Sequence, residues 1–295
     1  DASDLGAAHS LPGAAALEWL DRAREAGAPG GLLDAMAEGG TAVVASRTFG
    51  PGPTVAFRFD IDALPIDESG DPQHRPAREG FASAHPGWMH ACGHDGHITL
   101  GLGLARTLDR LAASCRGTVK LLFQPAEEGT KGGAAAITAR GHLDDATLVV
   151  ATHLGLDADR TGSVVCNAQF MGTCKYRARF RGAGAHVVLA PQTGRNALLA
   201  AAAAATALHG ITPHADGWFS VNVGVLRAGT EQGVTPAEAT IDVGAWWNCE
   251  PLEAYLRRRV RQVIEAAARL HDVEVEVQLI GEAPFVAVDA AVAER

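Results

Sequence analysis

The arrangement of hydrophobic and polar positions divides the chain into two parts. In the first part, short strands that are apolar along nearly their whole length alternate with helical segments. Such strands are typical of a mostly parallel sheet whose two faces are both covered by helices. The pattern predicts strands at residues 41–46, 54–59, 118–123 and 147–151, and helices at residues 17–26, 98–111 and 133–139.

From about Phe170 the strands change to alternating apolar and polar positions. Strands are predicted at residues 173–181, 219–227, 239–246 and 273–280, with helices at residues 196–209 and 252–270. This order, strand–helix–strand–strand–helix–strand, is the split βαβ or ferredoxin-like arrangement. We therefore expect an α/β fold in which an α+β domain at residues 170–282 is inserted after a first domain at residues 1–169, with residues 283–295 starting the return to the first domain.

Polar side chains that suit a metal follow three of the predicted parallel strands. They are, in chain order, Asp60 and Asp62, Glu127 and Glu128, and His153. In open α/β sheets, ligands bind beyond the carboxyl ends of the strands. The sequence therefore predicts that these side chains meet at one edge of one sheet.

The stretch from Met89 to His97 concentrates three histidines, Cys92, Asp95 and two glycines in nine residues, just before a predicted helix. Cys92 and His94 are two positions apart, so in an extended segment both side chains would leave from the same side. A thiolate and an imidazole together suit a borderline-soft divalent metal such as zinc. The stretch favours a metal site, and a loop whose histidines only form hydrogen bonds is the alternative.

Adjacent glutamates after a buried strand suggest a division of roles. Glu127 and Glu128 cannot point the same way from an extended segment, so one could bind metal while the other remains free as a general base. A metal lowers the pKa of its bound water to about 7, which supplies a nucleophile for an amide or ester carbonyl. Two exposed glutamates on a turn are the alternative.

Two further positions are candidates for supporting roles. Asp60 and Asp62 bracket one residue, so both carboxylates face the same side, and one of them could orient a ligating histidine. They could equally be simple caps at the end of a strand. His186 follows Gly182-Ala183-Gly184-Ala185 on a loop from which it could stabilise an oxyanion. A surface-loop histidine is the alternative there.

Composition limits the partners. The chain has 295 residues and a formal net charge of -9, with a sequence pI of about 5.7. This balance argues against nucleic-acid and anionic-membrane surfaces, which need a basic footprint. The five cysteines are odd in number and form no C-x-x-C pair, which predicts a reducing, cytoplasmic compartment. We expect no signal peptide and no membrane span, because residues 1–11 have no basic n-region and the longest purely apolar run, residues 197–205, is far shorter than the ~20 residues that a span requires.

Taken together, the motifs resemble those of the two-metal aminoacylase and carboxypeptidase superfamily of amidohydrolases, in its N-acyl-amino-acid hydrolase branch. The matching segments are residues 59–65, 89–97 and 123–129, His153, and residues 185–186 with 194–199. A closer likeness, to hydrolases of p-aminobenzoyl-glutamate, rests on residues 74–76, 79–83, 101–105 and 221–225. The resemblance spans residues 11–281.

The resemblance implies a role for each matched residue. It implies two zinc or manganese ions held by Cys92, His94, Glu128 and His153. Glu127 would be the general base, with Asp62 among the catalytic residues. His186 would reach the active site of a partner subunit, and Arg195 and Asn196 would bind substrate. The substrate would be an N-acyl or aroyl amino acid, and the chain would form a homodimer or a heterodimer with a paralogous subunit through a lid or dimerisation domain.

Some positions depart from the family pattern. The usual Arg-Asn before Val-x-Pro, which holds the substrate carboxylate, is Gln232-Gly233 here, and Val187-Val188 replaces the usual Ala-Gly after the lid histidine. The family also draws one more histidine ligand from a segment beyond Arg295. Two alternatives therefore stay open: an amidohydrolase with a different acyl-amino-acid substrate, and a non-catalytic subunit of a hetero-oligomeric hydrolase.

Overall fold

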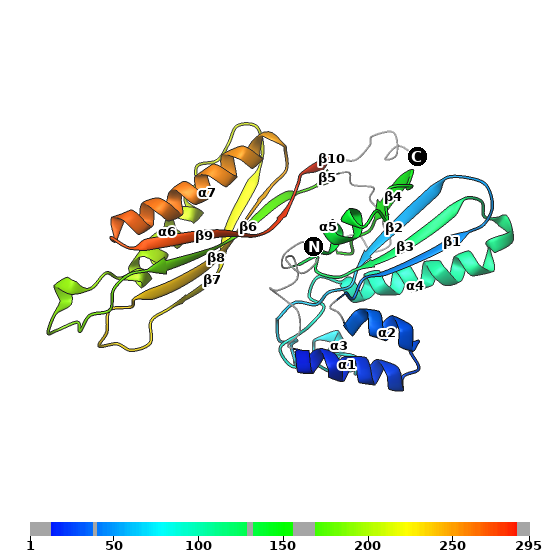
Figure 1. Cartoon of the computed structure of the whole chain (residues 1–295), viewed down its shortest axis with the longest axis horizontal. Helices are drawn as coiled ribbons and strands as arrows, with labels where there is room; N and C mark the ends of the chain where they lie inside the picture. The colour runs from blue at the N-terminus through cyan, green and yellow to red at the C-terminus, as the bar shows by residue number, and fades with distance from the viewer. Residues whose placement is uncertain (1–12, 38–39, 129–131, 156–168, 288–295) are drawn as a thin grey trace. The chain divides into compact units, whose positions relative to one another are not determined.

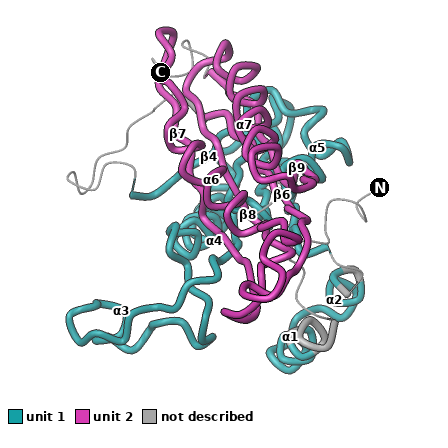
Figure 2. The backbone as a smooth tube through the Cα atoms, turned by 90° about the vertical axis from the view of Figure 1, so that its left-hand side faces the viewer, with its two compact units in different colours: residues 1–163 teal, residues 164–295 magenta. Residues whose placement is uncertain are grey.

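The computed structural model describes residues 13–37, 40–128, 132–155 and 169–287. The chain forms two compact units, residues 1–163 and 164–295, and each has its own sheet (Figures 1 and 2). In the first unit, helices α1 (Gly13–Glu25) and α2 (Gly30–Ala37) precede the sheet. Among the described residues, no helix combines the length and apolar character needed to cross a membrane.

The sheet of the first unit has four strands in the order β1-β3-β2-β4. Its strands are β1 (Val43–Thr48), β2 (Thr54–Asp60), β3 (Thr118–Gln124) and β4 (Leu148–Ala151). β2 pairs in parallel with both β3 and β4, whereas β1 pairs antiparallel with β3. The sheet is therefore mixed, with one antiparallel edge strand, and the carboxyl ends of its three parallel strands lie along one edge.

Two helices cover opposite faces of this sheet. Ile137 of α5 (Gly132–Ala139) packs with Ala56 and Leu122 in a buried cluster. Helix α4 (His94–Arg110) packs on β2 and β3 instead through Gly101, which lies against Phe59 and Phe123. Because successive side chains of a strand point to opposite faces, the phenylalanines and the α5 cluster are on different sides of the sheet.

Helix α4 begins four residues earlier than the sequence pattern indicated. The expected start was Ile98, but the helix starts at His94, with Gly93 as its N-cap at φ 79°. Cys92 and His94 are therefore not on one extended segment, as expected, because a left-handed glycine turns the chain between them. His94 and His97 are instead three residues apart on one helix, so they share a face, and their rings stack with centroids 5.3 Å apart.

A long loop joins the end of β2 to the start of α4 and is held together by several contacts. Leu64 and Met89 form an isolated antiparallel bridge that closes the long loop between β2 and α4. Glu68 crosslinks that loop by accepting a hydrogen bond from the backbone of Ser83 and pairing with His74 at 2.9 Å. The loop contains the short helix α3 (Arg75–Glu79), and the 3₁₀ turn Ala112–Ser114 follows α4.

The second unit is an antiparallel sheet in the order β7-β8-β6-β9 with two helices. Along the chain the elements are β6 (Gly172–Arg181), α6 (Ala197–His209), β7 (Phe219–Ala228), β8 (Glu238–Trp247), α7 (Pro251–Leu270) and β9 (Glu274–Ala283). This is the split βαβ order. The 3₁₀ turn Pro191–Thr193 precedes α6, and β5 (Gln169–Phe170) pairs with β10 (Val286–Ala287).

Alternation along β6 and β8 gives the second unit a one-sided core. Tyr176 and Phe180 of β6 and Trp247 of β8 are buried against α6 and α7. On β6, Arg177 points the other way and forms two hydrogen bonds of 2.7 Å with Asp242. One face of the alanine-rich run in α6, formed by Ala197, Ala200, Ala201 and Ala204, is buried, and these small side chains allow α6 and α7 to approach closely. One packed face and one polar face are typical of an antiparallel sheet.

Two glycines of α4 allow the packing of this helix to be tested. Gly101→Ala should lower the free energy of unfolding by roughly 1–2 kcal/mol, whereas Gly103→Ala should raise it by about 0.5–1 kcal/mol. A Cβ at Gly101 would lie 2.6 Å from Phe123 Cε1 and 2.8 Å from Phe59 Cδ2, and one at Gly103 would meet nothing within 4 Å. Both variants gain the same helix propensity. Equal shifts of the two variants in urea unfolding would contradict the described packing.

Candidate metal centre

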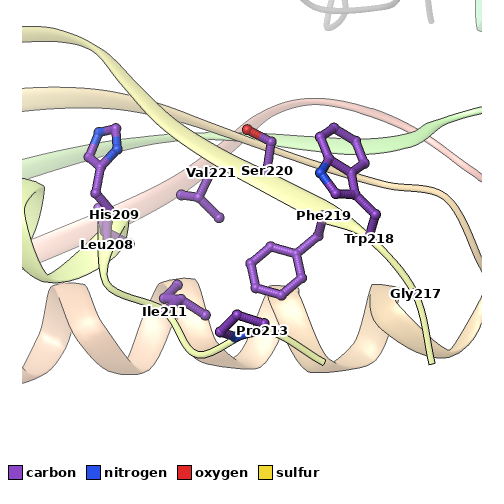
Figure 3. Close-up of a pocket in the computed structure, with 9 residues that line it drawn as sticks. All are labelled: Leu208, His209, Ile211, Pro213, Gly217, Trp218, Phe219, Ser220 and Val221. Carbon is purple, nitrogen blue, oxygen red and sulfur yellow. The ribbon is translucent and has the colours of Figure 1, made fainter. Parts of the chain in front are cut away.

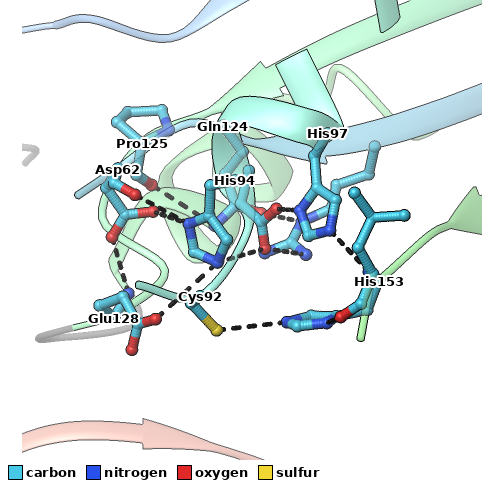
Figure 4. Close-up of polar contacts among 11 residues, drawn as sticks. Asp62, Cys92, His94, His97, Gln124, Pro125, Glu128 and His153 are labelled. Carbon is cyan, nitrogen blue, oxygen red and sulfur yellow. Dashed lines mark hydrogen bonds and ion pairs between the residues drawn. The ribbon is translucent and has the colours of Figure 1, made fainter. Parts of the chain in front are cut away.

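The candidate site lies at the carboxyl edge of the first unit's sheet. β2 ends at Asp60 and β3 at Gln124, and the register places these two residues opposite each other. β4 ends at Ala151, two residues before His153. The first turn of α4 brings His94 and His97 to the same place, and Figure 4 shows the side chains gathered there. The predicted convergence at one sheet edge is therefore present in the fold.

Three groups of side chains have possible ligand atoms within 4.8 Å of one another. His94 belongs to all three groups, and the other members come from four separate segments of the chain. The groups are Cys92, His94 and His153; His94, Glu127 and Glu128; and Asp60, His94 and His97. The five residues predicted as ligands and base thus meet around one imidazole.

The position of the proton on His94 follows from its contacts. Its Nδ1 lies 2.9 Å from the carbonyl oxygen of Asp62 and 3.2 Å from Oδ1 of the same residue, so Nδ1 carries the proton and donates it. The buried Nε2 makes no hydrogen bond and faces Asp60 Oδ2 at 3.6 Å and Glu128 Oε1 at 3.8 Å. A lone pair directed among carboxylate oxygens is suited to a cation.

Despite burial, the carboxylates around His94 raise the pKa of its imidazole. Burial works to lower the pKa of its imidazole, but the hydrogen bond with Asp62 and the negative charges of Asp60, Asp62 and Glu128 outweigh it, so this pKa is raised. For Asp62, burial works to raise the pKa, but hydrogen bonds from His94 and from backbone N–H groups outweigh it, so the pKa of this carboxyl is lowered. The cluster therefore favours added positive charge.

Cys92 and His153 face each other at the same edge. Cys92 Sγ lies 3.4 Å from Nε2 of His153, whose Nδ1 lies 2.7 Å from the carbonyl oxygen of Leu154. Nδ1 of His153 therefore carries the proton, and Nε2 is the lone pair that faces the sulfur. Burial, a hydrogen bond with Glu128 and the charges of Glu127 and Asp60 raise the pKa of the Cys92 thiol to about 12. Without a cation, Cys92 is a neutral thiol at pH 7.

A residue in the left-handed conformation sets the direction of the chain at the two glutamates. Ala126 has φ 54°, a conformation that costs a non-glycine residue about 1–2 kcal/mol. It follows Pro125 and turns the chain directly before Glu127. The backbone N–H of Glu128 then donates to Asp62 Oδ2 at 2.8 Å, which ties the end of β3 to the segment after β2. The strained turn directs two adjacent carboxylates into the cluster, where the sequence pattern had indicated an extended segment.

Two residues of the site, Arg58 and His97, were given no role of their own by the sequence analysis, although His97 lies in the histidine-rich stretch identified there. Arg58 forms an ion pair with Asp60 Oδ2 at 2.7 Å and donates from Nε to Gln124 Oε1 at 2.6 Å. His97 Nδ1 lies 2.5 Å from Asp60 Oδ1. An arginine within an apolar strand, two residues before an aspartate, was the available signal for Arg58, because charged residues are rarely buried without a partner. For His97 the signal was its spacing of three from His94.

The residues present fit a divalent metal. A thiol, two imidazoles and several carboxylates form a donor set for a borderline-soft ion such as zinc. Both His94 and His153 direct Nε2 toward the cluster while Nδ1 donates to a carbonyl oxygen. This is the outer hydrogen bond that metal-ligating histidines make. The particular role of each residue remains a prediction.

Three predicted residues, His186, Arg195 and Asn196, belong to the second unit. His186 Nδ1 accepts hydrogen bonds from the backbone N–H groups of Val188 and Leu189, at 3.2 and 3.3 Å. The backbone of Arg195 pairs with Ala183. Asn196 is the N-cap of α6, with Oδ1 accepting from Leu199 N at 3.1 Å. The side-chain oxygen of Asn196 therefore already has a structural role.

A cavity of the second unit has a different character (Figure 3). It lies where α6 ends and β7 begins, and its lining includes Ile211, Pro213, Trp218, Phe219 and Val221. None of the predicted site residues lines it, and its one titratable side chain is that of His209. Its lining therefore lacks the cluster of carboxylates, imidazoles and a thiol that is present at the carboxyl edge of the first unit's sheet.

Comparison with known proteins gives close relatives. The chain is 48% identical over 286 residues to indole-3-acetyl-aspartic acid hydrolase of Enterobacter agglomerans, covering 96% of this chain and 65% of the relative. It is 46% identical over 266 residues to one of the subunits of p-aminobenzoyl-glutamate hydrolase of Escherichia coli K12, covering 90% of this chain and 61% of the relative. The chain thus spans less than two thirds of the length of these curated relatives.

Solved structures agree with the sequence relatives. An aminobenzoyl-glutamate utilization protein from Klebsiella pneumoniae is similar with a TM-score of 0.73 and 37% identity, over 99% of this chain and 67% of that one. A Bacillus subtilis protein described as a dinuclear metal-binding peptidase of the M20 family matches with a TM-score of 0.57 and 26% identity, over 86% of this chain and 64% of that one.

The family pattern covers both units of the fold. The pattern described as Peptidase family M20/M25/M40 matches residues 56–294, from β2 through the rest of the second unit. The match includes every residue of the candidate metal centre. The chain therefore belongs to peptidase family M20/M25/M40.

Proposed function

We propose that the protein is a metal-dependent amidohydrolase that cleaves the amide bond of an N-acyl or aroyl amino acid. The observation that carries this proposal is the meeting of Cys92, His94, Glu127, Glu128 and His153 within coordination reach at one sheet edge. The named activities of the two curated relatives, which act on an indole-acetyl and an aminobenzoyl amino acid, support the substrate class.

The chemistry divides between the cations and the glutamates. Two divalent cations, zinc or manganese, held by Cys92, His94, Glu128 and His153 would act as Lewis acids, polarising the substrate carbonyl and making the attacking water more acidic. Glu127 takes a proton from that water as it attacks the carbonyl carbon, and gives it to the amide nitrogen as the C–N bond breaks. Asp62 holds the proton-donating Nδ1 of His94, which keeps the ring in its ligating orientation. The products are a carboxylic acid and a free amino acid.

For the second unit we propose a lid and dimerisation role. His186 would stabilise the oxyanion from a partner subunit, and Arg195 with Asn196 would help to bind the substrate. Because the Oδ1 atom of Asn196 caps α6, Asn196 would bind the substrate through its side-chain amide N–H group. The presence of Gln232-Gly233 in place of the Arg-Asn that the family resemblance implies favours a different contact with the substrate carboxylate.

A second chain is the other part of this proposal. The Escherichia coli relative is named as one subunit of its hydrolase, which supports a heterodimer with a paralogous chain, and a homodimer is the alternative. A non-catalytic subunit would bind one metal ion or none and would not turn over substrate alone. About two ions per chain in metal analysis, with turnover by this chain alone, would exclude a non-catalytic role.

Replacing the proposed base should separate catalysis from metal binding. Glu127→Gln should lower kcat by about 10²–10⁴-fold, because the amide cannot accept the proton of water. Its content of zinc or manganese should stay close to that of the unaltered protein. Asp95→Asn is the matched control. Asp95 is an exposed carboxylate in the first turn of α4, near the same sheet edge, and it belongs to none of the three ligand groups. A Glu127→Gln variant as active as the control would exclude Glu127 as the base.

A substrate panel should identify the acyl and amino portions. We expect aromatic acyl conjugates of aspartate or glutamate to give a higher kcat/KM than N-acetyl amino acids. Initial rates with p-aminobenzoyl-glutamate, indole-3-acetyl-aspartate and N-acetyl-glutamate would measure this. A preference for N-acetyl substrates would favour the alternative of a related amidohydrolase with a different substrate.

The chemical state of Cys92 provides a test of metal ligation. In metal-free protein, iodoacetamide should modify Cys92 slowly at pH 8, because a thiol with a pKa of about 12 is almost entirely protonated there. Glu128→Gln should speed this modification, since each unit of lowered pKa raises the thiolate fraction about tenfold. Zinc should protect Cys92 in the unaltered protein. Peptide mass spectrometry reads the Cys92 peptide, and equal labelling with and without zinc would argue against Cys92 as a ligand.

A further inference from the structure

A chain of buried polar contacts runs from the sheet to the segment that carries His153 (Figure 4). Arg58 of β2 holds Gln124 at 2.6 Å and Asp60 at 2.7 Å. The other oxygen of Asp60 lies 2.5 Å from Nδ1 of His97. Nε2 of His97 accepts the backbone N–H of Leu154 at 2.9 Å. Asp60 and His97 are both fully buried.

These contacts determine the tautomer of His97. A backbone N–H can only donate, so Nε2 must present a lone pair to Leu154. The ring proton is therefore on Nδ1, where it is donated to Asp60 Oδ1. Asp60 accepts it as a carboxylate whose charge is balanced by Arg58. His97 is a neutral ring with a donor at one end and an acceptor at the other, and both ends are used.

Leu154 is the residue next to His153, and its side chain does little to hold it. The residue is 45% exposed, so burial alone anchors it weakly. The side chain rests on the first turn of α4, where a Cβ at Gly96 would overlap with Leu154 Cδ1. The hydrogen bond to His97 is thus a directional contact that ties the backbone of Leu154 to helix α4. The ring of His97 also meets that of His153 edge-on, with centroids 4.9 Å apart.

We propose that His97 is a positioning residue which, held by Asp60 and Arg58, fixes the backbone of Leu154 and thereby aims Nε2 of His153 at Cys92. This inference rests on the proposed metal-dependent function. His97 then acts through His153 without binding the ion itself. The two histidines of one motif, His94 and His97, have different tasks although they share a helix face.

A double-mutant cycle separates positioning from a general structural role. His97→Phe keeps the size of the ring but removes the acceptor for Leu154 and the donor for Asp60. It should lower the affinity for Co²⁺ by about 10–100-fold, the usual effect of losing an outer-shell partner. In a His153→Ala background the same substitution should change the affinity by less than about twofold, because the residue through which His97 acts is gone.

Two further variants serve as controls. His97→Gln offers an amide oxygen to Leu154 and an amide N–H to Asp60, so it should recover most of the Co²⁺ affinity. Ile137→Ala weakens the core of the same unit away from the site, so it should lower stability while leaving the Co²⁺ affinity of the folded protein unchanged. Chelator competition and the thiolate-to-Co²⁺ charge-transfer band measure affinity and Cys92 ligation.

A measurement on the metal-free protein separates the positioning role of His97 from the proposed metal-dependent function. In the unaltered protein, ¹⁵N shifts should show His97 protonated at Nδ1, and hydrogen exchange should show the Leu154 amide protected and then exposed in His97→Phe. If the unaltered chain binds no Co²⁺, the proposed function fails, and Leu154 exchange still decides whether His97 holds this segment. An equal loss of affinity in both backgrounds, or an unprotected Leu154 amide, would overturn the positioning role even where metal binding is retained.

Discussion

The parallel pairing of β2 with β3 and with β4 is the constraint on which the candidate site depends. Parallel strands end at the same edge, so the segments after Asp60, Gln124 and Ala151 start side by side although they are far apart in the chain. Helix α4 adds its first turn at that edge because it packs on β2 and β3. Ligands are thus gathered by sheet topology rather than by a single contiguous motif.

Buried charge at this edge is balanced in two ways. Asp60 is neutralised within the protein by Arg58 and by the donated proton of His97. Around His94, burial is outweighed by the hydrogen bond with Asp62 and the charges of Asp60, Asp62 and Glu128, which raise the pKa of the ring. At Cys92, burial together with Glu128, Glu127 and Asp60 raises the pKa of the thiol. A buried charge is costly without a partner. The protein therefore supplies direct partners for Asp60, while the cluster around His94 and Cys92, to which Asp60 also contributes negative charge, is suited to a cation.

Backbone conformation has a direct chemical effect at two points. Gly93, at φ 79°, turns the chain between Cys92 and His94, so that the thiol and the imidazole approach from different elements. Ala126, at φ 54°, turns the chain before Glu127, although this conformation is strained for alanine where it would not be for glycine. Local strain is common at functional sites because the surrounding contacts hold it in place. Here the hydrogen bond between Glu128 N and Asp62 is one of those contacts.

The periodicity of apolar positions was enough to predict the strands and long helices of both sheets and the sheet edge at which polar residues gather, because periods of 2 and 3.6 report directly which side chains are buried. It did not indicate that α4 starts at His94, that β1 pairs antiparallel with β3, or that Arg58 and His97 support the site. A helix start set by a left-handed glycine, a strand partner and the tautomer of a buried histidine depend on contacts between segments distant in sequence. The sequence by itself determined which types of ligand are available and on which segments they lie. Only the tertiary structure decided which ring nitrogen of His94 and of His97 faces the cluster, because the partner of the opposite nitrogen comes from another element.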